Sequence, residues 1–138
     1  MIAKTITYTD YNGTPRTETF YFNMTKAELT MFRLSYAGGM DARLQQIIDS
    51  KSEPEIAAVF EDILRRSYGV KDLDGRRFRK SDELFEEFKQ TEAYSELIME
   101  LLTDTDAAIA FVNGVMPAGS AQVSVDATGK VVAMPTNN

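Results

Sequence analysis

The sequence predicts an α+β domain, in which an N-terminal β-hairpin packs on five or six mostly short helices and is followed by a loose C-terminal tail. Three observations support this fold class. Two segments of alternating polarity flank a turn in the first 22 residues, apolar residues recur at spacings of three and four in the middle of the chain, and no Phe, Tyr or Trp follows Val115. We therefore expect one globular domain over residues 1–116 and a flexible tail over 117–138.

The hairpin is predicted from two strands and the turn between them. Larger side chains alternate with small ones over residues 2–8, and a second strand is expected over 17–22. Between them, Asp10 to Gly13 supplies residue types that tolerate the backbone angles of a turn, and Pro15 limits where pairing resumes. The expected connection is a loop of several residues.

Three features of the sequence predict the start of the first helix. Thr25 is placed as its N-cap, Glu28 completes a capping box three residues later, and Met24 is placed to pack on Leu29. We expect the helix to begin near residue 26. The glycine pair at 38–39 offers the left-handed conformation that ends a helix.

Five further helices follow from apolar stripes and their start and stop signals. The first is a short helix over 41–49, and the second has Pro54 in its first turn and ends at Gly69. Ser81 and Thr91 are the N-caps of the third and fourth helices. The fifth begins at about Asp104 and stops before Gly114. After this helix, the stretch VSVDATGKVV allows a weak hairpin around residues 127–129. We favour a loose tail, because the segment lacks large aromatic side chains.

The segment Asp72 to Gly75 resembles the start of a calcium-binding loop, with Glu83 at the twelfth position. The resemblance fails in detail, because the glycine stands fourth rather than sixth, and the fifth and sixth positions are Arg76 and Arg77, which repel a cation. We therefore expect no metal here. The segment is interpreted as a turn joining two short extended segments, 68–71 and 77–79.

The composition argues against an enzyme. The chain has no histidine and no cysteine, which removes the commonest proton-transfer group, disulfides and thiolate metal sites. The pairs of neighbouring carboxylates lie in predicted first turns or on charged helix faces, where helix dipoles and solvation explain them. They are Glu53 and Glu55, Glu86 and Glu87, and Asp104 and Asp106. We predict no catalytic residues, no cofactor and no metal.

The charge of the chain points to protein partners. With 15 basic and 21 acidic residues the net charge is −6, so the average field repels nucleic acid and anionic membranes. No run of about 18 apolar residues occurs, and the first ten residues lack the apolar run of a signal peptide. We expect a protein of the cytoplasm, with neither nucleic acid nor membrane as a partner.

Two candidate partner-binding surfaces emerge from this pattern. Residues 65–80 contain seven basic and two acidic residues and so carry a net charge of +5, which suits an acidic partner; the alternative is a solvated loop. The hairpin offers an unpaired strand edge framed by aromatic side chains, which suits self-association or strand addition. The candidate residues are Tyr8, Tyr11 and Phe20 on the hairpin, and Arg76, Arg77 and Arg79 in the basic segment.

The order of several stretches resembles the tail assembly chaperones of long-tailed, siphovirus-type bacteriophages and prophages, in particular those of Gram-positive hosts. The stretches are TITYTDYNG, TETFYFNMTKAELT, a GG pair before a short helix, YGVKDLDGRRFRKS, and FKQTEAYSELIMELLTDTDAAIAFVNGVMP. The resemblance extends to about Pro117. It rests on order and spacing, because none of the stretches is a catalytic signature.

The resemblance implies a nonstructural protein that binds the tape measure protein, keeps it soluble and helps to recruit the major tail tube protein. Such a chaperone acts in the cytoplasm of the infected or lysogenic bacterial host and leaves before the virion is finished. Self-association is expected separately, from the open edge of the hairpin. Many relatives are also made in a longer form by programmed frameshifting. The alternative is a structural component of the virion, such as a head-tail connector or a tail terminator.

Overall fold

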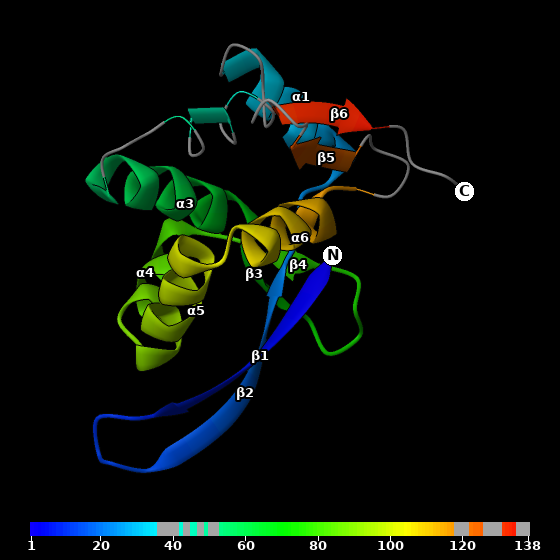
Figure 1. Ribbon diagram of the computed structural model, residues 1–138. Helices are drawn as coiled ribbons and strands as arrows, with labels where there is room; N and C mark the ends of the chain where they lie inside the picture. The colour runs from blue at the N-terminus through cyan, green and yellow to red at the C-terminus, as the bar shows by residue number, and fades with distance from the viewer. Residues whose placement is uncertain are drawn as a thin grey trace.

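A computed structural model describes residues 1–35, 42, 45–46, 49, 53–117, 122–125 and 131–134. Within these residues it confirms the α+β class, with an N-terminal hairpin followed by five helices (Figure 1). The elements are β1 (Ile2–Thr9), β2 (Pro15–Phe22), α1 (Lys26–Ser35), α3 (Glu53–Ser67), β3 (Tyr68–Lys71), β4 (Phe78–Arg79), α4 (Asp82–Lys89), α5 (Glu92–Thr103), α6 (Thr105–Val115), β5 (Gln122–Val125) and β6 (Val131–Met134).

The main sheet has the order β1-β2-β3-β4, and all neighbouring strands are antiparallel. β1 and β2 pair along their whole length, whereas β3 joins β2 only at Tyr21 and Phe22. The distal half of the hairpin therefore extends beyond the rest of the sheet (Figure 1).

The hairpin turn contains the residues that the sequence indicated. Asp10 and Thr14 close it, with the Asp10 N–H donating to Thr14 O at 2.9 Å and the Gly13 N–H donating to Asp10 O at 2.9 Å. Gly13 has a φ of 79°, which favours glycine, so this is a three-residue loop with a glycine bulge. The second strand begins at Pro15 and not at residue 17, because Pro15 lies opposite Thr9 at a position that needs no N–H toward β1.

The core lies between the inner face of the hairpin and the helices. Phe22 is fully buried at its centre, and its ring centroid lies 5.1 Å from Phe111 of α6, 5.7 Å from Tyr68 of β3 and 5.9 Å from Phe88 of α4. These tilted and edge-on ring pairs add to the stability gained from apolar burial. One residue thus joins the hairpin to the third strand and to two helices.

The predicted caps are confirmed. Thr25 and Glu28 form a reciprocal capping box, in which the Thr25 N–H donates to Glu28 Oε1 at 2.9 Å and the Glu28 N–H donates to Thr25 Oγ1 at 3.1 Å. The side chains of the predicted caps Ser81 and Thr91 accept from the backbone N–H three residues on. Asp104, which was expected only near the start of the last helix, caps it in the same way. Local sequence therefore sets where four of the helices begin.

Two glycines have roles other than the predicted ones. α3 ends at Ser67 and Gly69 lies within β3, where an added Cβ would lie 2.5 Å from the Phe78 ring. α6 continues through Gly114 to Val115, and a Cβ at Gly114 would lie 2.8 Å from Ile2. Both positions require glycine because another element packs against the backbone there, not because a helix ends.

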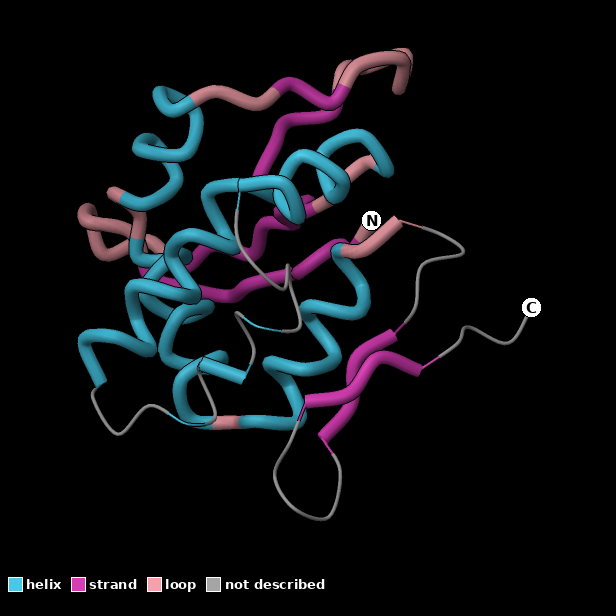
Figure 2. The backbone as a smooth tube through the Cα atoms, turned by 90° about the horizontal axis from the view of Figure 1, so that it is seen from above, coloured by secondary structure: helices cyan, strands magenta, loops and turns pink. Residues whose placement is uncertain are grey.

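The structure describes only parts of the predicted helix over 41–49 and of the C-terminal segment. The predicted helix over 41–49 lies outside the described residues except at four positions, and these are helical. In the C-terminal segment, the hairpin kept as the alternative to a loose tail is present, since β5 and β6 pair from Gln122↔Met134 to Val125↔Val131. This second hairpin lies beside α6 and apart from the main sheet (Figure 2). The domain boundary at residue 116 stays a prediction.

Lys80 joins three parts of the chain. Its ammonium group donates to the backbone carbonyl of Asn23 at 2.6 Å, to that of Arg66 at 2.8 Å and to Glu28 Oε2 at 2.8 Å. These acceptors belong to the start of α1, the end of α3 and the junction that follows β2. Burial raises the pKa of the Glu28 carboxyl, but hydrogen bonds from Lys80 and the Thr25 backbone outweigh this effect and hold the pKa below its ordinary value of 4.5.

The lowered pKa of Glu28 predicts a pH-dependent stability. A carboxyl whose folded pKa is depressed stabilises the fold above its unfolded pKa, and the contribution is lost as pH falls through the folded pKa. We expect Glu28→Gln to destabilise the protein at pH 7, and the difference from wild type to shrink below about pH 4.5. Urea unfolding between pH 7 and pH 3 measures it. Glu87→Gln, at an exposed position on α4, is the control; equal pH profiles for wild type and Glu28→Gln would contradict the prediction.

Candidate partner-binding surfaces

The described residues contain no group of three or more acidic, histidine or cysteine side chains placed to hold a metal ion. The shifted pKa values belong to contacts that stabilise the fold. Burial raises the pKa of Tyr94 to about 12 and also raises that of Tyr68, so both phenols stay neutral at physiological pH. A hydrogen bond from Arg16 lowers the pKa of Asp10 in the hairpin turn.

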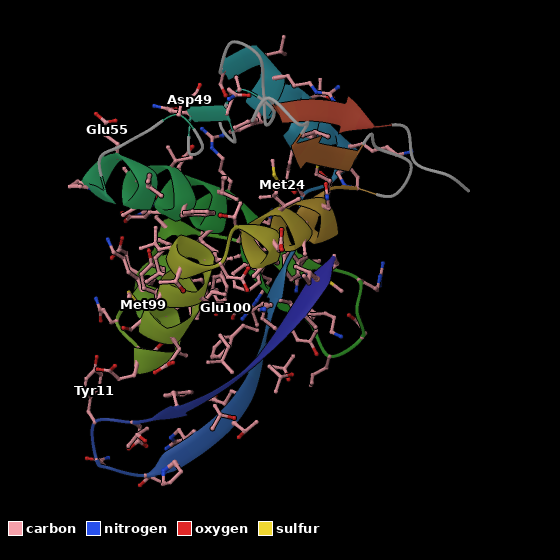
Figure 3. All side chains as sticks on the ribbon, viewed as in Figure 1. Tyr11, Met24, Asp49, Glu55, Met99 and Glu100 are labelled. Carbon is pink, nitrogen blue, oxygen red and sulfur yellow. The ribbon has the colours of Figure 1, made fainter. Side chains whose placement is uncertain are left out.

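The three aromatic candidates of the hairpin do not form one exposed strip. Phe20 lies on the inner face, with its ring centroid 4.8 Å from that of Phe88, and Tyr8 is half-buried with its hydroxyl donating to Glu18. Tyr11 is exposed at the tip, and its hydroxyl donates to the carbonyl of Gln90 at 3.2 Å (Figure 3). The register explains the difference, because Tyr8 and Phe20 share the face of Ile6. Their part in partner binding stays a prediction.

Much of the positive charge of segment 65–80 is neutralised within the fold. Arg65 pairs with Glu86 at 2.8 Å, and Arg66 pairs with Asp62 at 3.1 Å. At the turn between β3 and β4, Arg77 lies 2.8 Å and Arg79 3.6 Å from the Asp72 carboxylate. The segment thus has a smaller free charge than its composition suggests.

The tip of the β3–β4 turn remains open to a partner. Leu73 is fully exposed there, and within the described part of the chain Arg76 has no side-chain ion pair, hydrogen bond or ring contact. The turn itself is the predicted one, with Gly75 at a φ of 74° and its N–H donating to Asp72 O at 2.9 Å. Of the three predicted arginines, Arg76 is therefore the one most available for binding.

A groove that the sequence did not indicate runs between β1 and α5. Its volume is about 520 Å³, and its lining comprises Thr5 to Thr7 and the face of α5 between Glu96 and Thr103. Lys4 spans its rim, with its ammonium 3.0 Å from Glu100 Oε1 on the side of α5 that faces the hairpin (Figure 3). Met99, also in the lining, exposes 53% of its surface. No sequence pattern indicates this groove, because it is formed by two segments that lie far apart in the chain, Thr5 to Thr7 and Glu96 to Thr103.

The arrangement defines a class of protein: a small acidic α+β domain whose distinctive features are an open strand edge, a neighbouring groove and exposed apolar side chains, all suited to protein binding. A family model described as phage tail assembly chaperone matches residues 1–135. The chain belongs to this family. Among curated proteins and solved structures, no significant match is found. In the described part of the chain, no helix has both the length and the apolar character needed to span a membrane.

Proposed function

We propose that this tail assembly chaperone binds the tape measure protein, keeps it soluble and helps to recruit the major tail tube protein before leaving the growing particle. The family match over residues 1–135 carries the proposal. The proposed place of action is the cytoplasm of the bacterial host, and a longer form made by frameshifting belongs to the same proposal. Because the family is one of assembly proteins, we assign no catalytic step to any residue.

The exposed surface suits a chaperone of a long client. Several large apolar side chains of the described residues lie in solvent: Tyr11, Met31, Leu34, Leu73 and Met99. They are spread over the hairpin, α1, the β3–β4 turn and α5, and are not gathered in one patch. Scattered apolar contacts of this kind give a modest affinity per copy, and many self-associating copies along one client add avidity. Methionine side chains also adapt to more than one client segment.

The proposal is tested by coexpression with the tape measure protein of the same phage. We expect the tape measure protein to be recovered in the soluble fraction and to copurify with the chaperone, and to be insoluble when expressed alone. An equally soluble tape measure protein without the chaperone, or no copurification, would contradict the proposal. Mass spectrometry of purified virions provides the second readout. Abundant peptides from this chain would favour a structural component over a chaperone.

A further inference from the structure

The open edge of β1 presents a regular row of backbone groups. The Asp10–Thr14 hydrogen bond begins the ladder, and because bonded pairs alternate in an antiparallel ladder, the next bonded pairs are Tyr8/Arg16 and Ile6/Glu18. The N–H and C=O groups of Thr5 and Thr7 therefore point away from β2. β1 is the outermost strand of its sheet, and no described residue bonds to the backbone at this edge.

Most of the usual protections of an edge strand are missing from β1. Such strands are kept from pairing with other chains by short length, bulges, proline or charged side chains. β1 has eight residues, pairs one-to-one with β2 and contains no proline. Its charged residue, Lys4, is engaged by Glu100. On the outer face, Thr5 and Thr7 are uncharged, and their hydroxyls contact those of Thr19 at 2.9 Å and Thr17 at 3.1 Å.

The groove lies along this edge rather than over one face of the sheet. The groove is lined by three consecutive residues of β1, whose side chains point alternately to the two faces of the sheet. A groove that contacts all three must therefore lie along the backbone edge of the strand. On the helix side it follows α5 from Glu96 to Thr103, a rise of about 10 Å. About three residues of extended chain span that length. A strand added to β1 would lie in it.

The lining specifies the side chains of such a strand. Ile6 and Leu97 are buried beneath the groove, and the exposed Met99 offers a further apolar contact. Glu96 is exposed and has no ion pair within the described part of the chain. An occupant should therefore place one apolar and one basic side chain on the same face of a strand, which means two residues apart.

We propose that the groove between β1 and α5 binds an extended segment of the client as an added strand, selected by an apolar residue and a lysine or arginine two positions from it. The inference rests on the proposed chaperone function. A second copy carries a net charge of −6, which opposes docking beside the exposed Glu96. A basic segment of the client is therefore the occupant, rather than a second copy.

Two proline variants provide a matched test. Thr7→Pro removes an N–H that faces the groove, whereas Thr17→Pro removes the N–H of its cross-strand partner, which faces the opposite edge of the hairpin. The probe is a set of synthetic peptides that tile the coexpressed tape measure protein, and anisotropy measures their binding to the full chain. We expect Thr7→Pro to weaken the bound peptides about tenfold, the effect of one or two lost backbone hydrogen bonds, and Thr17→Pro to have little effect.

A charge variant keeps the test decisive if Thr7→Pro does not fold. Glu96→Lys changes an exposed residue. We expect it to weaken the binding of peptides that contain the apolar-basic pattern about fivefold and to remove the salt dependence of that binding, while Glu87→Lys on α4 does neither.

Unchanged peptide binding in both groove variants would overturn the inference but leave the proposed function standing. If light scattering shows that Thr7→Pro abolishes self-association alone, a second copy occupies the groove and the inference also falls. If no peptide and no intact tape measure protein binds wild type, the proposed function itself fails.

Discussion

Phe22→Ala is expected to lower the free energy of unfolding by about 3–5 kcal/mol, the usual cost of deleting a buried phenylalanine ring. The Phe22 side chain is fully buried and touches rings from β3, α4 and α6, so the cavity lies where four elements meet and cannot close by moving one of them. Since a domain of this size is stable by about 5–15 kcal/mol, the variant should be largely unfolded at elevated temperature. Urea denaturation at 25 °C measures the loss.

Two comparison variants make the result specific. Phe22→Leu keeps much of the volume and should lose about half as much or less, whereas Leu34→Ala, at a position on α1 that is 77% exposed, should change stability by about 0.5 kcal/mol or less. A loss below about 1 kcal/mol for Phe22→Ala would mean that the packing of the Phe88 and Phe111 rings does not depend on the Phe22 ring. The central position assigned to Phe22 would then be wrong.

Lys80→Met is the second change expected to have a large effect. Methionine preserves the apolar stem of the side chain but removes the ammonium group, which leaves the carbonyls of Asn23 and Arg66 and the carboxylate of Glu28 without this donor. The expected loss is about 1.5–3 kcal/mol, as for hydrogen bonds that involve a charged group. The pair is partly exposed, which keeps the value below that of a fully buried ion pair.

Lys89→Met is the matched control for Lys80→Met. Among the described residues, Lys89 bonds to one partner, Glu61, at 2.5 Å. Both side chains are about one-third exposed, so the loss of this bond should cost about 1 kcal/mol or less. Unfolding of both variants in urea, followed by circular dichroism, compares them directly. Equal losses would show that the three acceptors of Lys80 do not act together, and that the junction of α1, α3 and α4 is held by apolar packing.

The helix starts were predictable from the sequence because their causes are local. The hydroxyl of Thr25 caps α1 through Glu28, only three residues away, and the same holds for Ser81 and Thr91. The roles of Gly69 and Gly114 were not predictable. Each is small because a residue distant in sequence packs against it, and a sequence pattern records that a glycine is present but not which neighbour requires it.

The candidate surfaces, too, were predictable from the sequence only where their causes are local. Alternation correctly indicated that Ile6 and Tyr8 share a face, but it did not say that this face turns toward the helices, so Tyr8 and Phe20 were expected to be more exposed than they are. The charge of segment 65–80 can be counted in the sequence, and the pair of Arg66 with Asp62 lies within one helix. The pair of Arg65 with Glu86 depends instead on how α3 lies relative to α4. The groove required both the register of the hairpin and the position of α5.

The contact between the two ends of the folded domain has a consequence for its synthesis. The Met24 N–H donates to Val115 O at 3.0 Å, and Ile2 packs against Gly114, so the inner face of the first hairpin is completed by the last helix of the domain. At about 5–20 residues per second, a ribosome needs roughly 5–20 seconds to add the intervening residues. During that time the hairpin has an uncovered apolar face as well as an open edge. The nascent hairpin is therefore exposed to pairing and aggregation until residues 105–115 have been added and can pack on it.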